Sequence, residues 1–454
     1  MSTDRRSTPR DVSPKALVIG AGKSGVASAN FLAAQGERVI LTDANANPSL
    51  PMELDSRVEC AFGRAGDSTD FALLDGVRVI VISPGVPTTI PLVQRAAERA
   101  IPVLGEIELA FRQIKGGTVI AITGSNGKST TTALIGEILR VAGRQPIVAG
   151  NIGEPFIAAI DTERPRTYVL ELSSFQLEAV ESFHANVALL LNITPDHMDR
   201  YPHFDAYAAA KHRIFRNQTS GDTAIVNANE RRENARDSIA RVWRFSATKP
   251  VETGAWQDGD DLVIRTIGEE RRIPRASLKL QGQANVENAL AAWLAARAVG
   301  VDDMDVQIAF GTFAGLPHRM VLVRELNGIR WINDSKGTNV DATLKSLAGF
   351  DPNSVILILG GKDKAGEFER MRDAVQEKAR AVLTIGSSAD RIASALDGTT
   401  EIINADTMDT AVQWARENAR NGETVLLSPA CASFDQYRNF EHRGTHFEEL
   451  VNSL

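Results

Sequence analysis

The stretch "AITGSNGKSTTT" (residues 121–132) decides the fold, because it is a glycine-rich loop set between an apolar strand and a helix-like segment. Glycines let backbone N–H groups approach phosphate oxygens, Lys128 can reach the β- and γ-phosphates, and Ser129 can bind Mg²⁺. The loop is shorter than G-x-x-x-x-G-K-[ST], since Ile122 stands five residues before Gly127. It predicts an ATP site formed by Gly124, Ser125, Asn126, Gly127, Lys128, Ser129 and Thr130.

A second glycine loop lies about a hundred residues upstream, in "ALVIGAGKSG" (16–25). Gly20, Gly22 and Gly25 fit G-x-G-x-x-G, and Asp43 ends the next strand-like run. Taken alone, this pattern is typical of an NAD-dependent dehydrogenase. The motif is weak evidence, because any nucleotide-shaped ligand can use a glycine turn before a helix. The loop at 121–132 leaves a further alternative, an NTPase that works as a switch or binds a partner protein.

Length and composition bound the class of protein. A chain of 454 residues, with 43% hydrophobic and 24% charged residues, is ordinary for a globular protein of two to four domains. The net charge of −7 argues against a nucleic-acid partner. Two cysteines make no disulfide framework, and the longest apolar runs are far below the ~20 residues that span a bilayer. We expect a cytoplasmic monomer without membrane insertion, with residues 1–14 forming a disordered tail.

Short β-branched runs alternate with longer amphipathic segments along the whole chain, as in "RVILTD", "NVALLLN" and "SVILILGG". This alternation predicts an α/β protein whose parallel sheets are covered on both faces. Glycine and proline in "FRQIKGG" (111–117) and "GTFAGLPHRM" (311–320) indicate two boundaries. We therefore expect three domains: a Rossmann-like domain at 1–105, a P-loop ATPase-type domain at 106–315 and a Rossmann-like α/β domain at 316–454.

The shortened loop T-G-S-N-G-K-S resembles the ATP loop of the muramyl ligase family, which includes folylpolyglutamate synthetases. Other landmarks of that family follow in order, among them "GNIG" (150–153), "LELSSFQLE" (170–178), "NITPDHMDRY" (192–201), "AAAKHRIF" (208–215), "GQANVENALAA" (282–292), "GLPHRM" (315–320) and "NDSKGTN" (333–339). The stretches "ELSSFQLE", "HMDRY" and "SPACASFDQ" are similar to the D-glutamate-adding members. The D-N-P-R signature of the diaminopimelate- or lysine-adding members is absent. A sibling ligase with another amino-acid specificity remains a near alternative.

The resemblance implies ATP-dependent amide formation in peptidoglycan precursor synthesis. The substrates would be UDP-N-acetylmuramoyl-L-alanine, D-glutamate and ATP, joined through an acyl phosphate with release of ADP and phosphate. In this family the first domain holds the UDP-sugar, the central domain holds ATP and the third brings in the amino acid. The two glycine loops would then serve two different phosphate-bearing molecules.

The same resemblance assigns residues to the chemical step. Lys128, His197, Lys211 and Lys336 are the expected catalytic residues. Two Mg²⁺ ions would be held by Ser129, Glu171, His197 and Lys211, the lysine being carbamylated. The nucleotide-binding site would be completed by Asn285 and Asn288, which lie at i and i+3 on a helix-like segment, and by Arg319 and Asp334.

Two further groups of residues are expected to bind the other substrates. The UDP-sugar group is Lys23, Ser24, Asp43, Ser83, Pro84, Gly85, Asn151 and His197, with Ala44 and Asn45 as weaker uracil contacts. The D-glutamate group is Thr338, Lys364, Ser433, Phe434 and Phe440, with Lys362 as an alternative to Lys364. Gly337 stands where the family usually has alanine. "HRGTH" (442–446) has a metal-like histidine spacing, but Gly444 disfavours a helix there, and we interpret the pair as structural.

Overall fold

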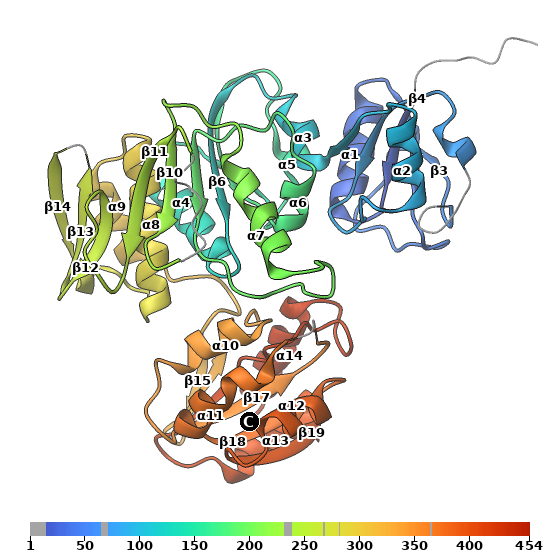
Figure 1. The fold of residues 1–454 in the computed structure, drawn as a ribbon. Helices are drawn as coiled ribbons and strands as arrows, with labels where there is room; N and C mark the ends of the chain where they lie inside the picture. The colour runs from blue at the N-terminus through green and yellow to red at the C-terminus, as the bar shows by residue number, and fades with distance from the viewer. Residues whose placement is uncertain (1–14, 65–70, 231–237, 267, 281, 364–365) are drawn as a thin grey trace, which may run out of the picture.

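The computed structural model describes residues 15–64, 71–230, 238–266, 268–280, 282–363 and 366–454. Three sheets follow one another along the chain, and each forms its own body (Figure 1). The expected α/β class with parallel-dominated sheets is confirmed. The expected disorder of residues 1–14 lies outside the described residues. Within the described residues, no helix is both long and apolar enough to cross a membrane.

The N-terminal sheet has five parallel strands and carries the first glycine loop. Their order is β3 (Glu59–Cys60), β2 (Arg38–Thr42), β1 (Lys15–Ile19), β4 (Val77–Ile82) and β5 (Val103–Gly105). The loop leads from β1 into α1 (Lys23–Ala34), and α2 (Pro91–Glu98) packs on the opposite face. This strand–turn–helix start explains why the sequence resembles a dinucleotide-binding domain.

The central sheet has nine strands, and its middle strands carry the phosphate loop (residues 123–129). The order is β14 (Glu269–Pro274), β13 (Asp261–Thr266), β12 (Gly254–Asp258), β11 (Arg241–Ser246), β10 (Thr223–Asn227), β9 (Val187–Leu190), β6 (Gly117–Thr123), β8 (Arg166–Glu171) and β7 (Ile147–Gly150). One face is covered by α4 (Lys128–Val141), α8 (Gln283–Ala298) and α9 (Asp303–Thr312). The other is covered by α5 (Phe156–Ala159), α6 (Ser174–Glu178) and α7 (Phe204–His212).

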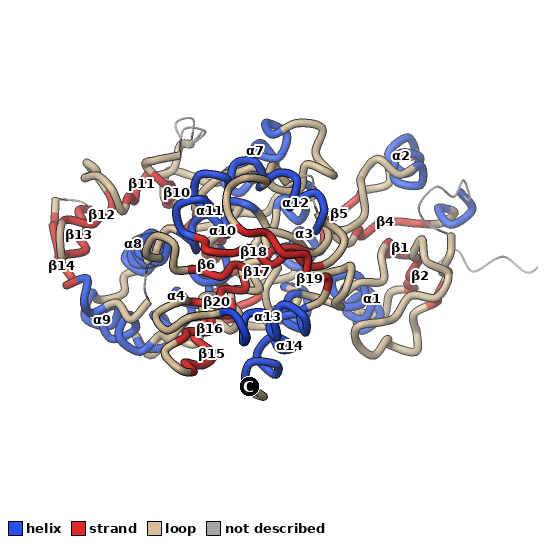
Figure 2. Tube along the Cα trace, turned by 90° about the horizontal axis from the view of Figure 1, so that it is seen from below, coloured by secondary structure: helices blue, strands red, loops and turns tan. Residues whose placement is uncertain are grey.

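The C-terminal sheet has six strands in the order β15 (Val321–Leu326), β16 (Ile329–Asn333), β20 (Thr424–Leu427), β17 (Val355–Gly360), β18 (Ala379–Ile385) and β19 (Glu401–Asp406). On one face lie α10 (Val340–Leu347), α11 (Arg372–Lys378) and α12 (Ala389–Leu396). On the other lie α13 (Met408–Asn418) and α14 (Phe440–Asn452), as the view from below shows (Figure 2). The sheet is therefore covered on both faces, as buried parallel strands require.

The two junctions between domains differ in character. One apolar cluster runs without a break from β1 and α1 through α3 (Glu106–Phe111) and α5 into the central sheet. The two clusters of the C-terminal sheet, in contrast, consist of residues between 323 and 454. Burial therefore fixes the first junction, whereas the contacts that reach the C-terminal domain from the phosphate loop are polar.

Two features differ from what the sequence predicts. The sheet edges β13, β14 and β15 run antiparallel to their neighbours, because each is joined by a short hairpin rather than by a crossover helix. The expected weakening of a helix at Gly444 is wrong, since α14 runs through it. A Cβ built there would lie 2.3 Å from His318 Nδ1, so packing against His318 selects glycine.

Candidate active site

The phosphate loop lies at the carboxyl end of β6, in the middle of the central sheet. Gly124 and Gly127 have φ of +154° and +85°, and Gly127 is the N-cap of α4. A side chain at Gly127 would meet Asn288 Oδ1, which lies 2.3 Å from the position of a Cβ. Asn288 in turn donates to Asn285 Oδ1 at 3.2 Å, which places both predicted asparagines of α8 beside the start of α4.

The loop that follows β9 supports the phosphate loop from one side. Asn192 accepts from the N–H of Asn126 at 2.8 Å and donates to its carbonyl at 3.0 Å. Ser125 Oγ donates to the carbonyl of Thr194 and accepts from its N–H, both at 2.9 Å. The phosphate loop is thereby fixed by the loop after β9, through the Asn192 side chain and the Thr194 backbone.

Two lysines meet at a single carbonyl of the phosphate loop. Lys128 Nζ and Lys211 Nζ each donate to the Gly124 carbonyl at 2.8 Å, although Lys211 comes from α7. Lys211 is 2% exposed. Its burial, together with the charge of Lys128, holds the pKa of the Lys211 amine well below its usual value, while Asp196 and Glu171 oppose the shift. A neutral amine is therefore accessible at Lys211.

The C-terminal domain adds two cations and a carboxyl group. Arg319 donates to Ser129 Oγ at 3.1 Å, across the boundary between the domains. Burial, then the charge of Arg319, lowers the pKa of the Lys336 amine to about 8, and its Nζ lies 3.7 Å from the centre of the Phe440 ring. Burial also raises the pKa of Asp334 to about 6, although hydroxyls of Ser346 and Ser428 donate to it.

Glu171 supplies negative charge among these cations. It ends β8 and is 1% exposed, and Asn151 donates to its Oε1 at 2.8 Å. Its Oε2 is buried without a hydrogen-bond partner among the described residues. A buried carboxylate oxygen without a partner is a fitting ligand for a cation.

The donor set suits Mg²⁺ held together with a substrate. Within the described part of the chain, no three His, Cys, Asp or Glu side chains gather as metal ligands. Mg²⁺ is commonly held by one or two carboxylates together with phosphate oxygens and water. Glu171 and the Ser129 hydroxyl fit that pattern. His197 has a φ of +59°, and its ring packs edge-on against Phe175 with centroids 4.8 Å apart.

The predicted UDP-sugar residues of the first domain lie on the loops that follow β1, β2 and β4. Ser83 Oγ donates to the Gly20 carbonyl at 2.9 Å, and Asp43 accepts from the N–H of Ala21 at 2.7 Å and from that of Asn45 at 2.9 Å. Lys23 and Ser24 begin α1, and Ala44 follows Asp43. A hollow beside this loop is lined by residues that include Ser83, Pro84, Glu106, Phe175, Gln176 and Glu178.

Arg200 of the central domain bridges the junction of the first two domains. Arg200 donates to the Gly85 carbonyl at 3.1 Å and to Glu178 at 3.2 Å, and its guanidinium lies 4.2 Å from the centre of the Phe175 ring. Glu106, at the start of α3, accepts from the N–H of Ile157, and burial raises the pKa of this carboxyl to about 7. The first sheet is thus linked to the central domain by a polar contact at Gly85 as well as by the apolar cluster.

The predicted D-glutamate residues lie around the carboxyl ends of β16, β17 and β20. Ser433 is buried, Phe434 is exposed, and Phe440 begins α14. Lys362 pairs with Ala432 through both backbone groups, which places it beside Ser433, and Thr338 follows Lys336 in the same loop. Lys364 lies outside the described residues.

Sequence reasoning missed several residues that the fold brings to the phosphate loop. Asn339 and Asp341 bond Asn126 of the phosphate loop, and Asn339 also bonds Asp196 of the supporting loop. Tyr207 bonds Ser125 at 3.0 Å. Asp196 and Asn339 lie within the family motifs at 192–201 and 333–339, and that position was the one sign in the sequence of a role at the site. Tyr207 and Asp341 gave none, because a tyrosine or an aspartate in a helical segment is ordinary.

Comparison with known proteins identifies the class. Three family models match in chain order: the Mur ligase MurD-like N-terminal domain at 14–105, the Mur ligase middle domain at 122–296 and the Mur ligase glutamate ligase domain at 318–431. The chain belongs to the Mur ligase family.

Its relatives carry a more particular name. The UDP-N-acetylmuramoylalanine–D-glutamate ligase of Koribacter versatilis is 44% identical over 448 residues, covering 97% of each chain. The protein of the same name in Myxococcus xanthus is 42% identical over 450 residues, covering 97% of this chain and 98% of that one.

Solved structures agree on the fold. UDP-N-acetylmuramate–alanine ligase of Thermotoga maritima has a TM-score of 0.60 at 19% identity, covering 97% of this chain and 99% of that one. E. coli FolC in complex with ADP has a TM-score of 0.58 at 18% identity, covering 76% of this chain and 93% of that one. The similarity reaches all three sheets, whereas a dehydrogenase would account for the first glycine loop alone.

Proposed function

We propose that this chain joins D-glutamate to UDP-N-acetylmuramoyl-L-alanine at the expense of ATP, as a step in peptidoglycan precursor synthesis. The observation that carries the proposal is the gathering of Lys128, Lys211, Arg319 and Lys336 around the phosphate loop, with Glu171 among them. A carboxylate and a triphosphate repel each other, and cations supplied from two domains reduce that repulsion. The names of the relatives supply the substrates.

The first step transfers a phosphoryl group. A carboxylate oxygen of UDP-N-acetylmuramoyl-L-alanine attacks the γ-phosphorus, the bond to the bridging oxygen breaks, and ADP leaves with an acyl phosphate formed. Lys128 and Lys336 hold the transferring group, and Arg319 neutralises charge beside Ser129. We assign Asn285 and Asn288, which lie beside Gly127, to the nucleotide as well. Gly124, Ser125, Asn126, Gly127 and Thr130 would complete the loop around the phosphates.

The second step forms the amide. The amine nitrogen of D-glutamate attacks the acyl carbon, loses a proton, and the tetrahedral intermediate expels phosphate. We assign Ser433, Phe440 and Thr338 to the amino acid, since Phe440 and Thr338 lie beside Lys336. Lys364 or Lys362 would supply a cation to its carboxylates. Phe434 would cover it from solvent.

Mg²⁺ would be held by Glu171 and Ser129, with His197 at a second position, and it would neutralise phosphate charge. Lys211 would serve as a carbamate: its neutral amine attacks CO₂, a nitrogen–carbon bond forms and one proton is released. The lowered pKa of Lys211 favours the neutral amine, and Lys128 offers the carbamate a counter-charge. We expect labelled bicarbonate to give a carbamate signal in carbon NMR of the wild type and none in Lys211→Ala.

The substrates divide among three domains, which we place at 1–105, 106–315 and 316–454. The UDP-sugar would lie along the first glycine loop, with Lys23, Ser24, Asp43, Ser83, Pro84, Gly85 and Asn151 contacting it, and reach His197. Its carboxylate would thereby meet the nucleotide held by the central sheet.

Phosphate release from ATP and Mg²⁺ tests this function. We expect release to require both UDP-N-acetylmuramoyl-L-alanine and D-glutamate, with L-glutamate inactive. Release that ignores the amino acid would instead indicate an NTPase without ligase chemistry. Release with a different amino acid would indicate a sibling specificity. A Lys128→Met variant serves as the matched control and should release about a thousandfold less phosphate.

A further inference from the structure

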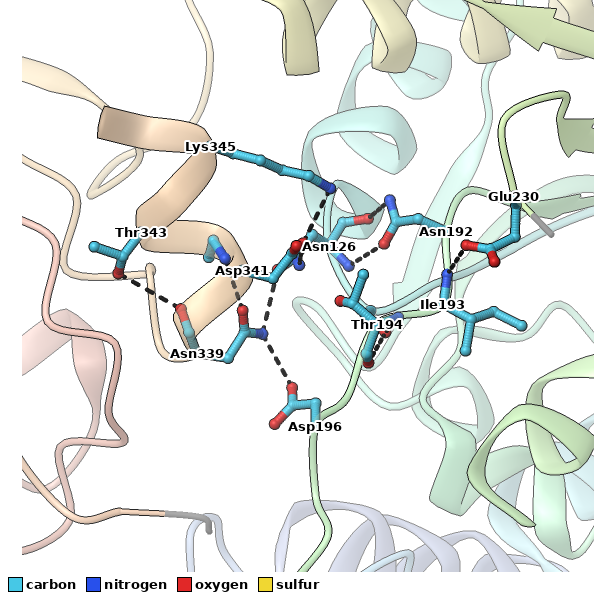
Figure 3. A network of polar contacts seen from close by, with 12 residues as sticks. Asn126, Asn192, Ile193, Thr194, Asp196, Glu230, Asn339, Asp341, Thr343 and Lys345 are labelled. Carbon is cyan, nitrogen blue, oxygen red and sulfur yellow. Dashed lines mark hydrogen bonds and ion pairs between the residues drawn. The ribbon is translucent and has the colours of Figure 1, made fainter. Parts of the chain in front are cut away.

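A small polar network joins the C-terminal domain to the phosphate loop (Figure 3). Asn339 and Asp341, at the start of α10, face Asn126 of the phosphate loop and Asp196 of the loop after β9. Asn339 is 8% exposed although it lies at the boundary between domains. The network therefore acts where apolar packing does not join the two domains.

The start of α10 bonds both the nitrogen and the oxygen of the Asn126 side-chain amide. Asn126 Nδ2 donates to Asp341 Oδ2 at 3.0 Å, while Asn126 Oδ1 accepts from Asn339 Nδ2 at 3.3 Å. Asn339 Nδ2 also donates to Asp196 Oδ2 at 3.2 Å. The first turn of α10 thus offers one acceptor and one donor to Asn126, and a second donor proton to Asp196. Such a pattern is satisfied in one docking position of the C-terminal domain.

Asn126, the partner of Asn339 on the phosphate loop, is held in place. The N–H and carbonyl of Asn126 are bonded to Asn192, so the side chain alone projects toward α10 (Figure 3). Asn339 is itself fixed, because its Oδ1 accepts from the N–H of Ala342 at 2.8 Å and caps the helix.

The spacing in sequence links this network to the chemistry. Asn339 stands three residues after Lys336, Asn126 two residues before Lys128, and Asp196 directly before His197. A displacement of Asn339 would shift Lys336 relative to Lys128. A misplacement of about 1 Å can slow a reaction of this kind about a hundredfold.

We propose that Asn339 and Asp341 are positioning residues, which register the segment carrying Lys336 against the phosphate loop and against Asp196. The inference rests on the proposed ligase function for its kinetic consequence, but not for its structural one. Neither residue needs to touch a substrate, since each acts through Asn126 or Asp196.

The test is Asn339→Asp, which separates the two roles of this side chain. The aspartate keeps an oxygen to cap Ala342, so α10 retains its N-cap. It loses the donor to Asn126 and sets a carboxylate against Asp196. We expect kcat to fall about 10- to 100-fold, because losing the hydrogen bonds to Asn126 and Asp196 would let Lys336 shift relative to Lys128. The melting temperature and the KM for UDP-N-acetylmuramoyl-L-alanine should stay as in the wild type.

The matched control is Lys345→Met, which removes the ion pair from Lys345 to Asp341 at 3.2 Å and leaves the contacts with Asn126 in place. It should keep kcat within about twofold. Wild-type kcat for Asn339→Asp would overturn the proposal, as would a kcat that falls only together with the melting temperature.

Hydrogen exchange on the substrate-free chain keeps the inference distinct from the proposed function. In Asn339→Asp we expect faster exchange across 123–130 and 192–197, with unchanged exchange across α10. This result stands whether or not the wild type proves to be a ligase. Unchanged exchange across both 123–130 and 192–197 would overturn the positioning role, even in an active enzyme.

Discussion

Lys336 is the residue whose ionisation should set the alkaline limit of activity. Burial and Arg319 lower the pKa of this amine to about 8, so it is charged at neutral pH and loses its proton just above it. We expect kcat to fall about tenfold per pH unit above pH 8. In Lys336→Arg, which stays charged, the descending limb of the pH profile should move to higher pH.

The direction of the stability change separates this effect from unfolding. Between about pH 8 and the ordinary lysine pKa of 10.5, the unfolded chain binds this proton and the folded chain does not. The contribution of Lys336 to folding therefore becomes more favourable as pH rises through that window. A descending limb at the same pH in Lys336→Arg would show that another group is responsible.

At the scale of elements, α3 is anchored through one buried carboxylate. Glu108 accepts from the N–H groups of Glu181, Ser182 and Phe183, from the hydroxyl of Ser182 and from Arg112. Burial alone would raise the pKa of Glu108, but these donors lower it to about 2. This carboxylate ties the helix that follows the first sheet to the loop beyond α6.

We expect Glu108→Gln to destabilise the protein by about 2 kcal/mol at pH 7, since an amide presents N–H groups to N–H donors. For a domain of this size that lowers the melting temperature by about 4–8 °C. The wild-type advantage is present above the ordinary pKa of 4.5 and is lost as pH falls toward about 2. Melting curves at pH 7 and pH 3 check this. Glu181→Gln, whose exposed side chain meets Arg112, is the control and should change little.

At the scale of the whole molecule, the two glycine loops belong to different sheets, so a substitution in one should leave the ligand of the other bound. We expect Lys128→Ala to abolish turnover while leaving the affinity for UDP-N-acetylmuramoyl-L-alanine largely intact. The physical reason is that Lys128 bonds within the central domain, at Gly124 and Ser125. Calorimetric titration of the variant with the UDP-sugar checks this. Loss of both properties together would contradict the assignment of the ligands to separate domains.

Much of the fold could be predicted, because hydrophobic periodicity and glycine turns act locally. The runs that became β1, β6 and β17 are continuous and apolar, since both faces of a parallel sheet are buried. The strand β14 escaped prediction, since it reads "EERRIP" and only its Ile273 is buried. Resemblance could suggest roles for Lys211 and Glu171, but local sequence gave no reason to expect either to be buried.

The sequence by itself determined the α/β class, the phosphate loop and the family motifs, because each depends on residues that are close along the chain. Only the tertiary structure decided which charges meet. Lys211 reaches the Gly124 carbonyl across 87 residues, and Arg319 reaches Ser129 across 190. The lowered pKa of Lys336 likewise arises from its burial in the folded chain. The contact of Asn339 with Asn126 arises because folding brings two domains together. Burial and Coulomb energy depend on distance in space, which no local pattern records.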